Sequence, residues 1–247
     1  MSLVIICGAT ATGKSDLAIS VAKEINAEIV NADSMQLYKG MDIGTAKLSL
    51  LEREGIKHHL LDELEISEEA NVSWYQGQAR KIIDNLIDSG KSVVVVGGTG
   101  LYIKAILDDL NFPDTDPAVR QKLTGEAQVL GNDQMHARLA TLDPAAALAI
   151  PKENIRRVIR ALEVIEITGK PFTANLPKEA STKYPNAYQF GLVLDRENLD
   201  EKIDRRVEGM WEKGFVREVM QLMTKGLEKA TTAKMALGYS QIMNYLN

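Results

Sequence analysis

An apolar run followed by a glycine-rich octapeptide constrains the fold of this chain more than any other feature. Residues 3–7 read as a buried strand, and "GATATGKS" follows directly at residues 8–15. A glycine, four residues and then Gly-Lys-Ser, placed between a strand and a helix, is typical of a phosphate-binding loop. The loop amides and the helix N-terminus favour an anion, and the lysine adds a positive charge. The predicted phosphate-binding residues are Gly8, Ala9, Thr10, Ala11, Thr12, Gly13, Lys14 and Ser15.

Strand and helix patterns alternate through the first part of the chain. The predicted elements are, in order, a helix over 14–25, a strand over 27–33, a helix over 74–89 and a strand over 92–98. In the first helix, Leu17, Val21 and Ile25 are expected to face the core. The valine run of the last strand is apolar on both faces, as in a parallel sheet covered by helices. These elements predict an α/β fold: a P-loop NTPase-like parallel sheet flanked by helices.

The pattern changes at "NFPDTDP", residues 111–117, where two prolines and polar residues mark a connection. Beyond it the sequence is helical to about residue 170, with breaks at Gly131 and at Asp143-Pro144, then a loop over 168–185. A strand over 187–195 and further helices complete the chain. Residues 112–187 therefore form a predicted helical insertion domain in a core made of residues 1–111 and 188–247.

The composition excludes several classes of protein. No apolar stretch approaches the ~18 residues that a membrane span needs, and no secretory signal pattern is present. One cysteine among 247 residues fits a reducing compartment, so we expect a cytoplasmic protein. Three histidines and this cysteine form no zinc pattern, and the net charge of −5 argues against non-specific nucleic-acid binding.

The sequence lacks the metal-binding carboxylate that a nucleotide hydrolase usually carries at the end of an apolar strand. The run at 93–96 ends instead in "GGTGLY". Asp33 does end a strand, and the carboxyl edge of a parallel sheet is where such folds place their ligands. Asp33 is therefore a candidate for handling substrate, the alternative being a solvated loop carboxylate.

Several segments, in order, resemble the tRNA dimethylallyltransferase family, also called tRNA isopentenyltransferases. They are "GATATGKS", "NADSMQLYKGMDIGTAK", "HHLLD", "VVVGGTGLYIKAI", "DPAVR", "RRVIRALEV" and "ALGYSQ". The "DS" with "YKGMDIGTAK" and the "GGTGLY" segments are the most specific, and the resemblance covers nearly the whole chain. It implies transfer of a prenyl group from dimethylallyl diphosphate to N6 of an adenosine beside the tRNA anticodon.

The resemblance also implies roles for particular residues in catalysis and diphosphate binding. Asp33 matches the general base, and Thr99 would lie beside it; its hydroxyl could also cap the helix that begins near residue 101, and the two roles can coexist. Lys14, the loop amides and Mg²⁺, ligated by Ser15, would stabilise the diphosphate leaving group. Arg160 matches an arginine near that diphosphate.

For the tRNA, the resemblance implies contacts from both parts of the chain. The matched residues are Asp33, Ser34, Met35, Gln36, Thr99, Arg120, Arg156, Arg157, Val158, Ile159 and Arg160. Helical spacing places Arg156 and Arg160 on one face, opposite a packed face that includes Val158. Without the resemblance, these arginines read as a charged exterior face paired with Glu163, and Arg120 as a solvated charge.

Other functions remain open on the residues alone. The same prenyl chemistry on free adenine nucleotides is one alternative, and a small-molecule kinase whose loop holds ATP is another. The insertion favours an enzyme acting on tRNA, because it adds surface for an RNA stem. We expect this enzyme to be a monomer. Family members usually continue beyond "GYSQIMNYL" with a basic, tryptophan-containing region near the tRNA. We therefore do not expect residues 1–247 alone to reach the full tRNA affinity of the family. Because no zinc-finger extension follows, the resemblance is to the bacterial type.

Overall fold

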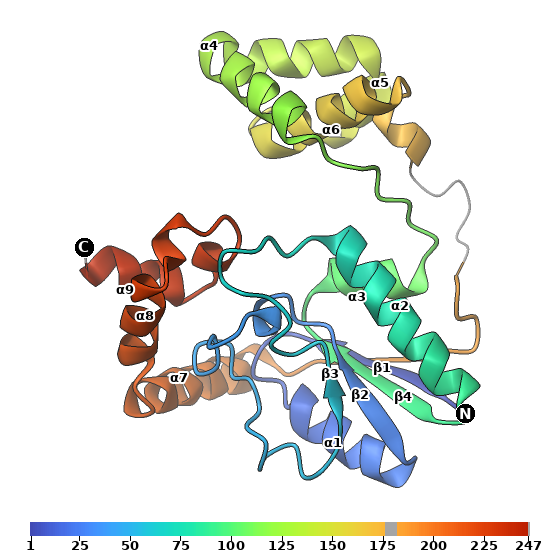
Figure 1. Ribbon diagram of the computed structural model, residues 1–247, viewed down its shortest axis with the longest axis vertical. Helices are drawn as coiled ribbons and strands as arrows, with labels where there is room; N and C mark the ends of the chain where they lie inside the picture. The colour runs from blue at the N-terminus through green and yellow to red at the C-terminus, as the bar shows by residue number, and fades with distance from the viewer. Residues whose placement is uncertain (176–181, 247) are drawn as a thin grey trace. The chain divides into compact units, whose positions relative to one another are not determined.

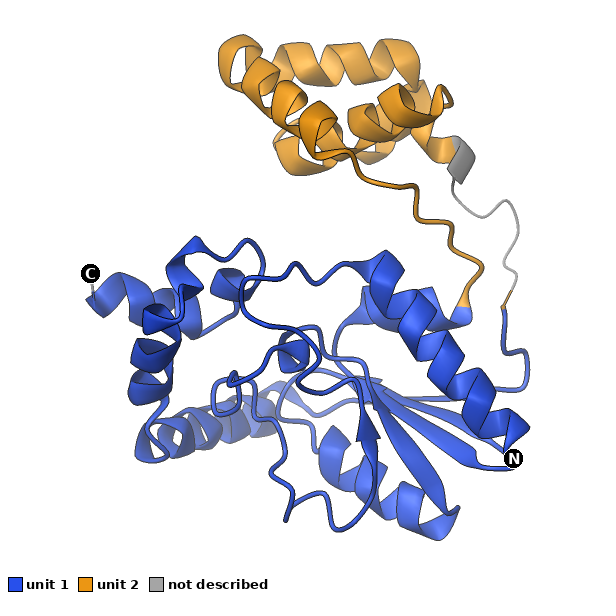
Figure 2. Cartoon of the chain, in the orientation of Figure 1, with its two compact units in different colours: residues 1–107, 183–247 blue, residues 108–182 orange. Residues whose placement is uncertain are grey.

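A computed structural model describes residues 1–175 and 182–246 of the chain, which fall into two compact units (Figure 2). The first unit comprises residues 1–107 and 183–247, and the second comprises residues 108–182. The predicted boundaries of the insertion, 112 and 187, lie a few residues further along the chain. Part of the predicted 168–185 loop lies outside the described residues. Among those described, no helix combines the length and apolarity that crossing a membrane requires.

The described part of the first unit contains a five-stranded sheet in the order β3-β2-β4-β1-β5 (Figure 1). Its strands are β1 (Leu3–Gly8), β2 (Ala27–Asn31), β3 (His58–His59), β4 (Ser92–Gly97) and β5 (Tyr188–Leu192). Every pairing is parallel, with Ile5 of β1 opposite Val95 of β4 and Gln189 of β5. The α/β prediction is confirmed, and the carboxyl ends of β1, β2 and β4 meet at one edge.

Helices cover both faces of this sheet. The helix α1 (Lys14–Glu24) packs on one face, against Val4, Ile29 and Val94. On the other face, α2 (Val72–Asp88) and α3 (Gly100–Leu107) pack against Ile5 and Val95. Because successive strand residues point to opposite faces, the apolar runs of the sequence supply both cores.

The buried face of α1 agrees only in part with the predicted one: Val21 and Ile25 are partly buried against this core, but Leu17 is not. Its buried residues are Ala18, Ile19 and Ala22, whereas Leu17 is 39% exposed. Alanines let the helix axis approach the sheet closely, so the stripe of small residues faces inward. The spacing of the larger side chains predicted Val21 and Ile25 correctly but did not predict the buried alanines.

The strand β5 forms an edge of the sheet, as the predicted strand over 187–195, but it is not buried. Tyr188 is 60% and Phe190 is 53% exposed. The chain continues into α7 (Arg196–Glu212), α8 (Phe215–Thr224) and α9 (Tyr239–Leu246), with short 3-10 turns at Leu227–Lys229 and Ala233–Met235. The last two helices pack on the core that contains α2 and α3.

The second unit is helical, built from α4 (Pro117–Leu142), α5 (Pro144–Ala149), α6 (Ile155–Thr168) and a 3-10 turn at Phe172–Asn175. The predicted breaks are present: Gly131 leaves the helical conformation with φ 80°, and Asp143 caps α5 through the amide of Ala146. Its core includes Leu123, Leu139 and Leu162.

Candidate active site

The phosphate-binding loop has the backbone that its sequence predicts. Gly13 adopts φ 84°, a left-handed conformation that glycine takes without strain, immediately before α1. The hydroxyl of Thr12 donates to the carbonyl of Ala9 at 2.8 Å, and the ammonium of Lys14 donates to the same carbonyl. The loop is thus closed on itself, and Ser15 lies in the first turn of α1, where amides lack partners within the helix.

Asp33 follows the end of β2 and is held by its neighbours. Its amide donates to the side-chain oxygen of Asn31 at 3.0 Å, and Asn31 donates back to the carbonyl of Asp33 at 2.9 Å. The amide of Met35 donates to Oδ1 of Asp33 at 2.9 Å. No hydrogen bond to Oδ2 is present among the described residues. One carboxylate oxygen is therefore fixed by the backbone, while the other has a free lone pair for a ligand.

Thr99 lies beside this loop because β4 and β2 approach very closely where they end. A Cβ on Gly97 would lie 2.2 Å from the carbonyl of Ala32, so only glycine fits there. The amide of Thr99 then donates to the carbonyl of Ala32 at 3.1 Å. Its hydroxyl accepts from the amide of Ser34 at 3.1 Å, and its carbonyl accepts from the amides of Tyr102 and Ile103 at the start of α3. The structure thus brings together Asp33, Ser34 and Thr99.

The residues after Ser34 lie along the same edge. Met35 is partly buried against the main core, whereas Gln36 donates to the carbonyl of Thr45 at 3.0 Å. Met35 and Gln36 therefore both contact other parts of the first unit.

Arg206 of α7 completes this site, and sequence reasoning missed it. Burial lowers the pKa of Lys14, the Arg206 guanidinium lowers it further, and the Asp33 carboxylate partly offsets both. Burial also lowers the pKa of Arg206, and Asp33 opposes that change. Lys14, Arg206 and Asp33 come from distant segments of the chain and interact electrostatically. Such a pair of cations suits an anion of high charge.

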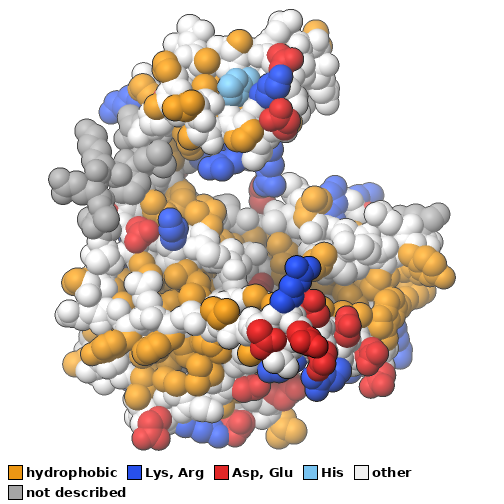
Figure 3. Space-filling model, turned by 180° about the vertical axis from the view of Figure 1, so that it is seen from behind, with side chains coloured by type: hydrophobic (Ala, Val, Ile, Leu, Met, Phe, Trp, Pro, Cys, Tyr) orange, Lys and Arg blue, Asp and Glu red, His pale blue; other side chains and the backbone are white. Residues whose placement is uncertain are grey.

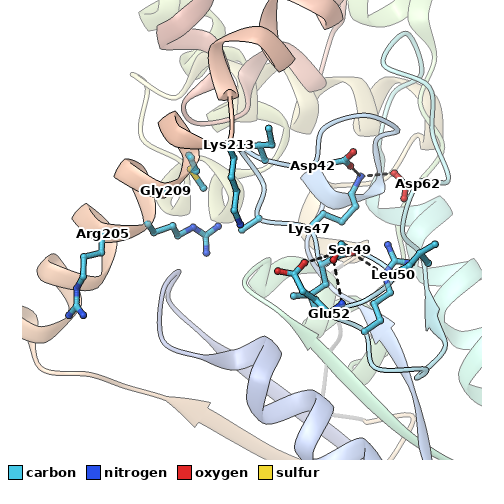
Figure 4. Close-up of a pocket in the computed structure, with 15 residues that line it drawn as sticks. Asp42, Lys47, Ser49, Leu50, Glu52, Asp62, Arg205, Gly209 and Lys213 are labelled. Atoms are coloured by element: carbon cyan, nitrogen blue, oxygen red, sulfur yellow. Dashed lines mark hydrogen bonds and ion pairs between the residues drawn. The ribbon is translucent and has the colours of Figure 1, made fainter.

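A groove of about 840 Å³ lies beside these groups, between the loop after Asp42 and α7 (Figure 4). Arg206 lines it. The ammonium of Lys47, only 2% exposed, lies between the carboxylates of Asp42 at 2.7 Å and Asp62 at 2.6 Å. These ion pairs fix one wall of the groove.

In the helical unit, Arg120 and Arg160 both bind Glu163, which is fully buried. Arg120 donates to it from two nitrogens, at 2.7 and 3.2 Å, and Arg160 from one at 2.9 Å. Burial opposes ionisation of Glu163, but the two guanidinium groups outweigh it and hold its pKa below the usual range. Arg160 also donates to the carbonyls of Pro113 and Asp114, at 2.6 and 3.3 Å. Both arginines thus have a structural role. The pairing of Arg160 with Glu163 that the bare sequence suggested is present, whereas Arg120 is not the solvated charge that it suggested.

Removing both arginines should destabilise the helical unit. We expect Arg120→Ala with Arg160→Ala to cost about 3–5 kcal/mol, because a buried carboxylate would lose its compensating charges. Amide hydrogen exchange over α4 and α6 measures this locally. Since the pKa of Glu163 is lowered, the stabilisation in the wild type is present above the unfolded-state pKa and is lost as pH falls through the folded-state pKa.

A surface pair provides the control for this double variant. Lys122 pairs with Glu166 at 2.8 Å in the same unit, and its side chain is 54% exposed. Lys122→Ala should cost less than about 1 kcal/mol. Equal protection in the double variant and in this control would contradict a structural role for the arginines.

The other residues of the predicted tRNA segment divide into two groups. The side chains of Val158 and Ile159 are 0% and 9% exposed and pack in the core of the unit. Arg156 and Arg157 are exposed. Within the described residues, neither has an ion pair or a side-chain hydrogen bond.

Known proteins resemble this chain over most of its length. A family model described as IPP transferase matches residues 36–247, which is most of the chain. The chain belongs to the IPP transferase family. Two bacterial relatives are called tRNA dimethylallyltransferase. That of Thermobifida fusca is 54% identical, covering 100% of this chain and 78% of the relative, and that of Streptomyces griseus is 51% identical, covering 99% and 78%.

Solved structures of IPP transferases share the fold. The crystal structure of the full-length tRNA isopentenylpyrophosphate transferase from Bacillus halodurans has a TM-score of 0.67 at 37% identity, covering 99% of this chain and 77% of that one. A eukaryotic dimethylallyltransferase acting on tRNA has a TM-score of 0.84 at 28% identity, covering 100% and 63%.

Proposed function

We propose that this IPP transferase moves a dimethylallyl group from dimethylallyl diphosphate to N6 of an adenosine beside the anticodon of certain tRNAs. The observation that carries the proposal is the placement of Asp33 next to Thr99, within the field of Lys14 and Arg206. A base and an anion site are what prenylation of an amine requires. No water has to be activated, so a hydrolase-type carboxylate after β4 is not needed.

The groups can be assigned to one substitution step. N6 forms a bond to the first carbon of the dimethylallyl group while the bond from that carbon to the diphosphate oxygen breaks. The electron pair leaves with the diphosphate, and the N6 proton passes to Oδ2 of Asp33. Lys14, Arg206 and the loop amides stabilise the negative charge that develops on the leaving group. The hydroxyls of Ser34 and Thr99 orient the adenine amino group.

Magnesium fits this site as an ion that arrives with the diphosphate. Mg²⁺ prefers oxygen ligands and is commonly held by one or two protein groups together with substrate phosphates and water. Ser15 supplies one such oxygen at the start of α1. The residues that the structure describes include no cluster of three or more His, Cys, Asp or Glu side chains suited to a metal. Bound there, the ion would neutralise charge on the leaving group.

For the tRNA, the helical unit offers two adjacent exposed arginines, Arg156 and Arg157. Figure 3 shows acidic and basic side chains mixed on the face of the first unit that it presents, so no broad basic field covers that face. RNA affinity must then come from local groups such as Arg156 and Arg157, which have no protein partner within the described residues and suit phosphates.

Arg156→Ala with Arg157→Ala should weaken tRNA binding and reduce its salt dependence. Each lost phosphate contact lowers the slope of log affinity against log salt by about 0.7 to 0.9. The measurement is tRNA binding at a series of salt concentrations. Lys23→Ala, which removes one exposed charge near the end of α1, is the control and should leave the slope unchanged. A wild-type slope in the double variant would mean that these arginines make no contact with tRNA phosphates.

The proposed function has a direct test. The protein is incubated with tRNA, dimethylallyl diphosphate and Mg²⁺, and the tRNA nucleosides are analysed by mass spectrometry. Prenylated adenosine is the expected product. Prenylation of free adenine nucleotides but not of tRNA would favour a nucleotide prenyltransferase. Tighter binding of ATP, with transfer of its γ-phosphate, would indicate a kinase and overturn the proposal.

A further inference from the structure

The carboxylate of Glu218, on α8, is surrounded by donors from a distant loop. The consecutive amides of Asp42, Ile43 and Gly44 donate to it at 3.1, 2.8 and 3.3 Å. The hydroxyl of Tyr239, at the start of α9, donates to the same carboxylate at 2.5 Å. Consecutive amides converging on one anion form a nest, an arrangement that proteins more often use for phosphates. Here a side chain of the protein occupies it.

Close packing holds the loop at residues 42–44 against α8 and α9. The rings of Phe215 and Tyr239 meet edge to face, with centroids 4.8 Å apart. A Cβ on Gly44 would lie 2.3 Å from the ring of Phe215, and one on Gly238 would lie 2.9 Å from it. The loop therefore rests its backbone directly on α8 and α9. Burial and the carboxylate of Glu218 both raise the pKa of Tyr239, so its hydroxyl stays protonated and remains a donor.

The loop leads from this contact to the active site. Immediately after Gly44, the carbonyl of Thr45 accepts from Arg206 at 3.4 Å and from Gln36 at 3.0 Å. The hydroxyl of Thr45 donates to the carbonyl of Met41 at 2.6 Å, which closes the loop into one turn. Two residues further on, Lys47 fixes the groove wall. A shift of the amides at 42–44 would therefore move the carbonyl that orients Arg206.

We propose that Glu218 and Tyr239 form a positioning pair: they clamp the 42–47 loop so that Arg206 faces the diphosphate. The proposal rests on the function proposed above only in giving Arg206 a diphosphate to bind. Neither Glu218 nor Tyr239 touches substrate in this scheme. Their effect reaches it through the loop backbone and one guanidinium.

The test compares Glu218→Gln with wild type in binding inorganic diphosphate with Mg²⁺. Glutamine keeps the size but replaces one acceptor oxygen with a donor, which opposes the amides. The dissociation constant should rise roughly tenfold, the usual effect of losing bonds to a charged acceptor. Tyr239→Phe should act in the same direction but less, because the amides keep their partner. The KM for dimethylallyl diphosphate should rise likewise, while tRNA affinity stays unchanged.

A double-mutant cycle with Arg206→Ala separates positioning from general stabilisation. If Glu218 acts through Arg206, Glu218→Gln should weaken diphosphate binding little further once Arg206 is absent. Additive effects, or a lowered melting temperature with unchanged diphosphate affinity, would overturn the proposal. Glu212→Gln, an exposed carboxylate on α7, is the charge control and should match wild type. Because the inorganic-diphosphate arms need no turnover, absence of prenylated adenosine would count against the function and not against the clamp.

Discussion

Asp33→Asn is expected to slow single-turnover prenyl transfer by about 10² to 10⁴, the range for loss of a general base. Asparagine keeps the oxygen that accepts from the amide of Met35, so the loop geometry should persist. What is lost is the capacity of Oδ2 to take the N6 proton. Diphosphate affinity should barely change, because the neutral amide does not repel the anion. Transfer is measured by quenching a single turnover, and affinity by calorimetry on the same variant.

The same two measurements distinguish a competing role for Asp33. If Asp33 instead contacts Mg²⁺ through water, the variant would lose diphosphate affinity before it loses the chemical step. Asp88→Asn, at the exposed end of α2, is the matched control and should transfer at the wild-type rate. A wild-type rate in Asp33→Asn would remove this carboxylate from the mechanism.

The parts of the site that lie in continuous motifs could be predicted from the sequence. The phosphate loop follows from its glycine spacing, and Asp33 follows from its place at a strand end. Parallel strands then bring their carboxyl ends to one edge, so the neighbourhood of Asp33 and Thr99 follows as well. The alternative role of Thr99 as a helix cap could not be settled beforehand, because either bond suits a hydroxyl at that position.

Arg206 could not be found in this way. It lies on α7, none of whose residues is fully buried. Nothing in the local sequence pattern separates it from Arg205. Only the packing of α7 against the 42–47 loop distinguishes the two. The burial of Glu163 was not predicted for a related reason. Charged residues are rarely buried, so the sequence favours a solvated position for it. Two arginines that converge from separate helices make its burial possible.

Arg206→Ala is expected to slow transfer by about 10² to 10³, as found when one preorganised donor to a developing anion is removed. The loss should be greater in the chemical step than in diphosphate affinity. Charge on the diphosphate grows as the bond to the prenyl carbon breaks, so the guanidinium contributes more in the transition state than in the ground state. Folding should be little affected, because within the described part of the chain this side chain makes a single hydrogen bond, at 3.4 Å to the carbonyl of Thr45.

Arg205→Ala is the matched control for this variant. It removes the same type of side chain one position earlier on α7. Arg205 is 69% exposed there and, among the described residues, its one ion pair is with Glu201 at 3.4 Å. Its transfer rate should stay within about twofold of wild type, since an exposed ion pair contributes little. Arg206→Lys should recover part of the loss, because lysine restores the charge but not the planar fork that binds two phosphate oxygens at once. If Arg206→Ala and Arg205→Ala transfer at the same rate, the leaving group is stabilised by Lys14 and the loop amides without α7.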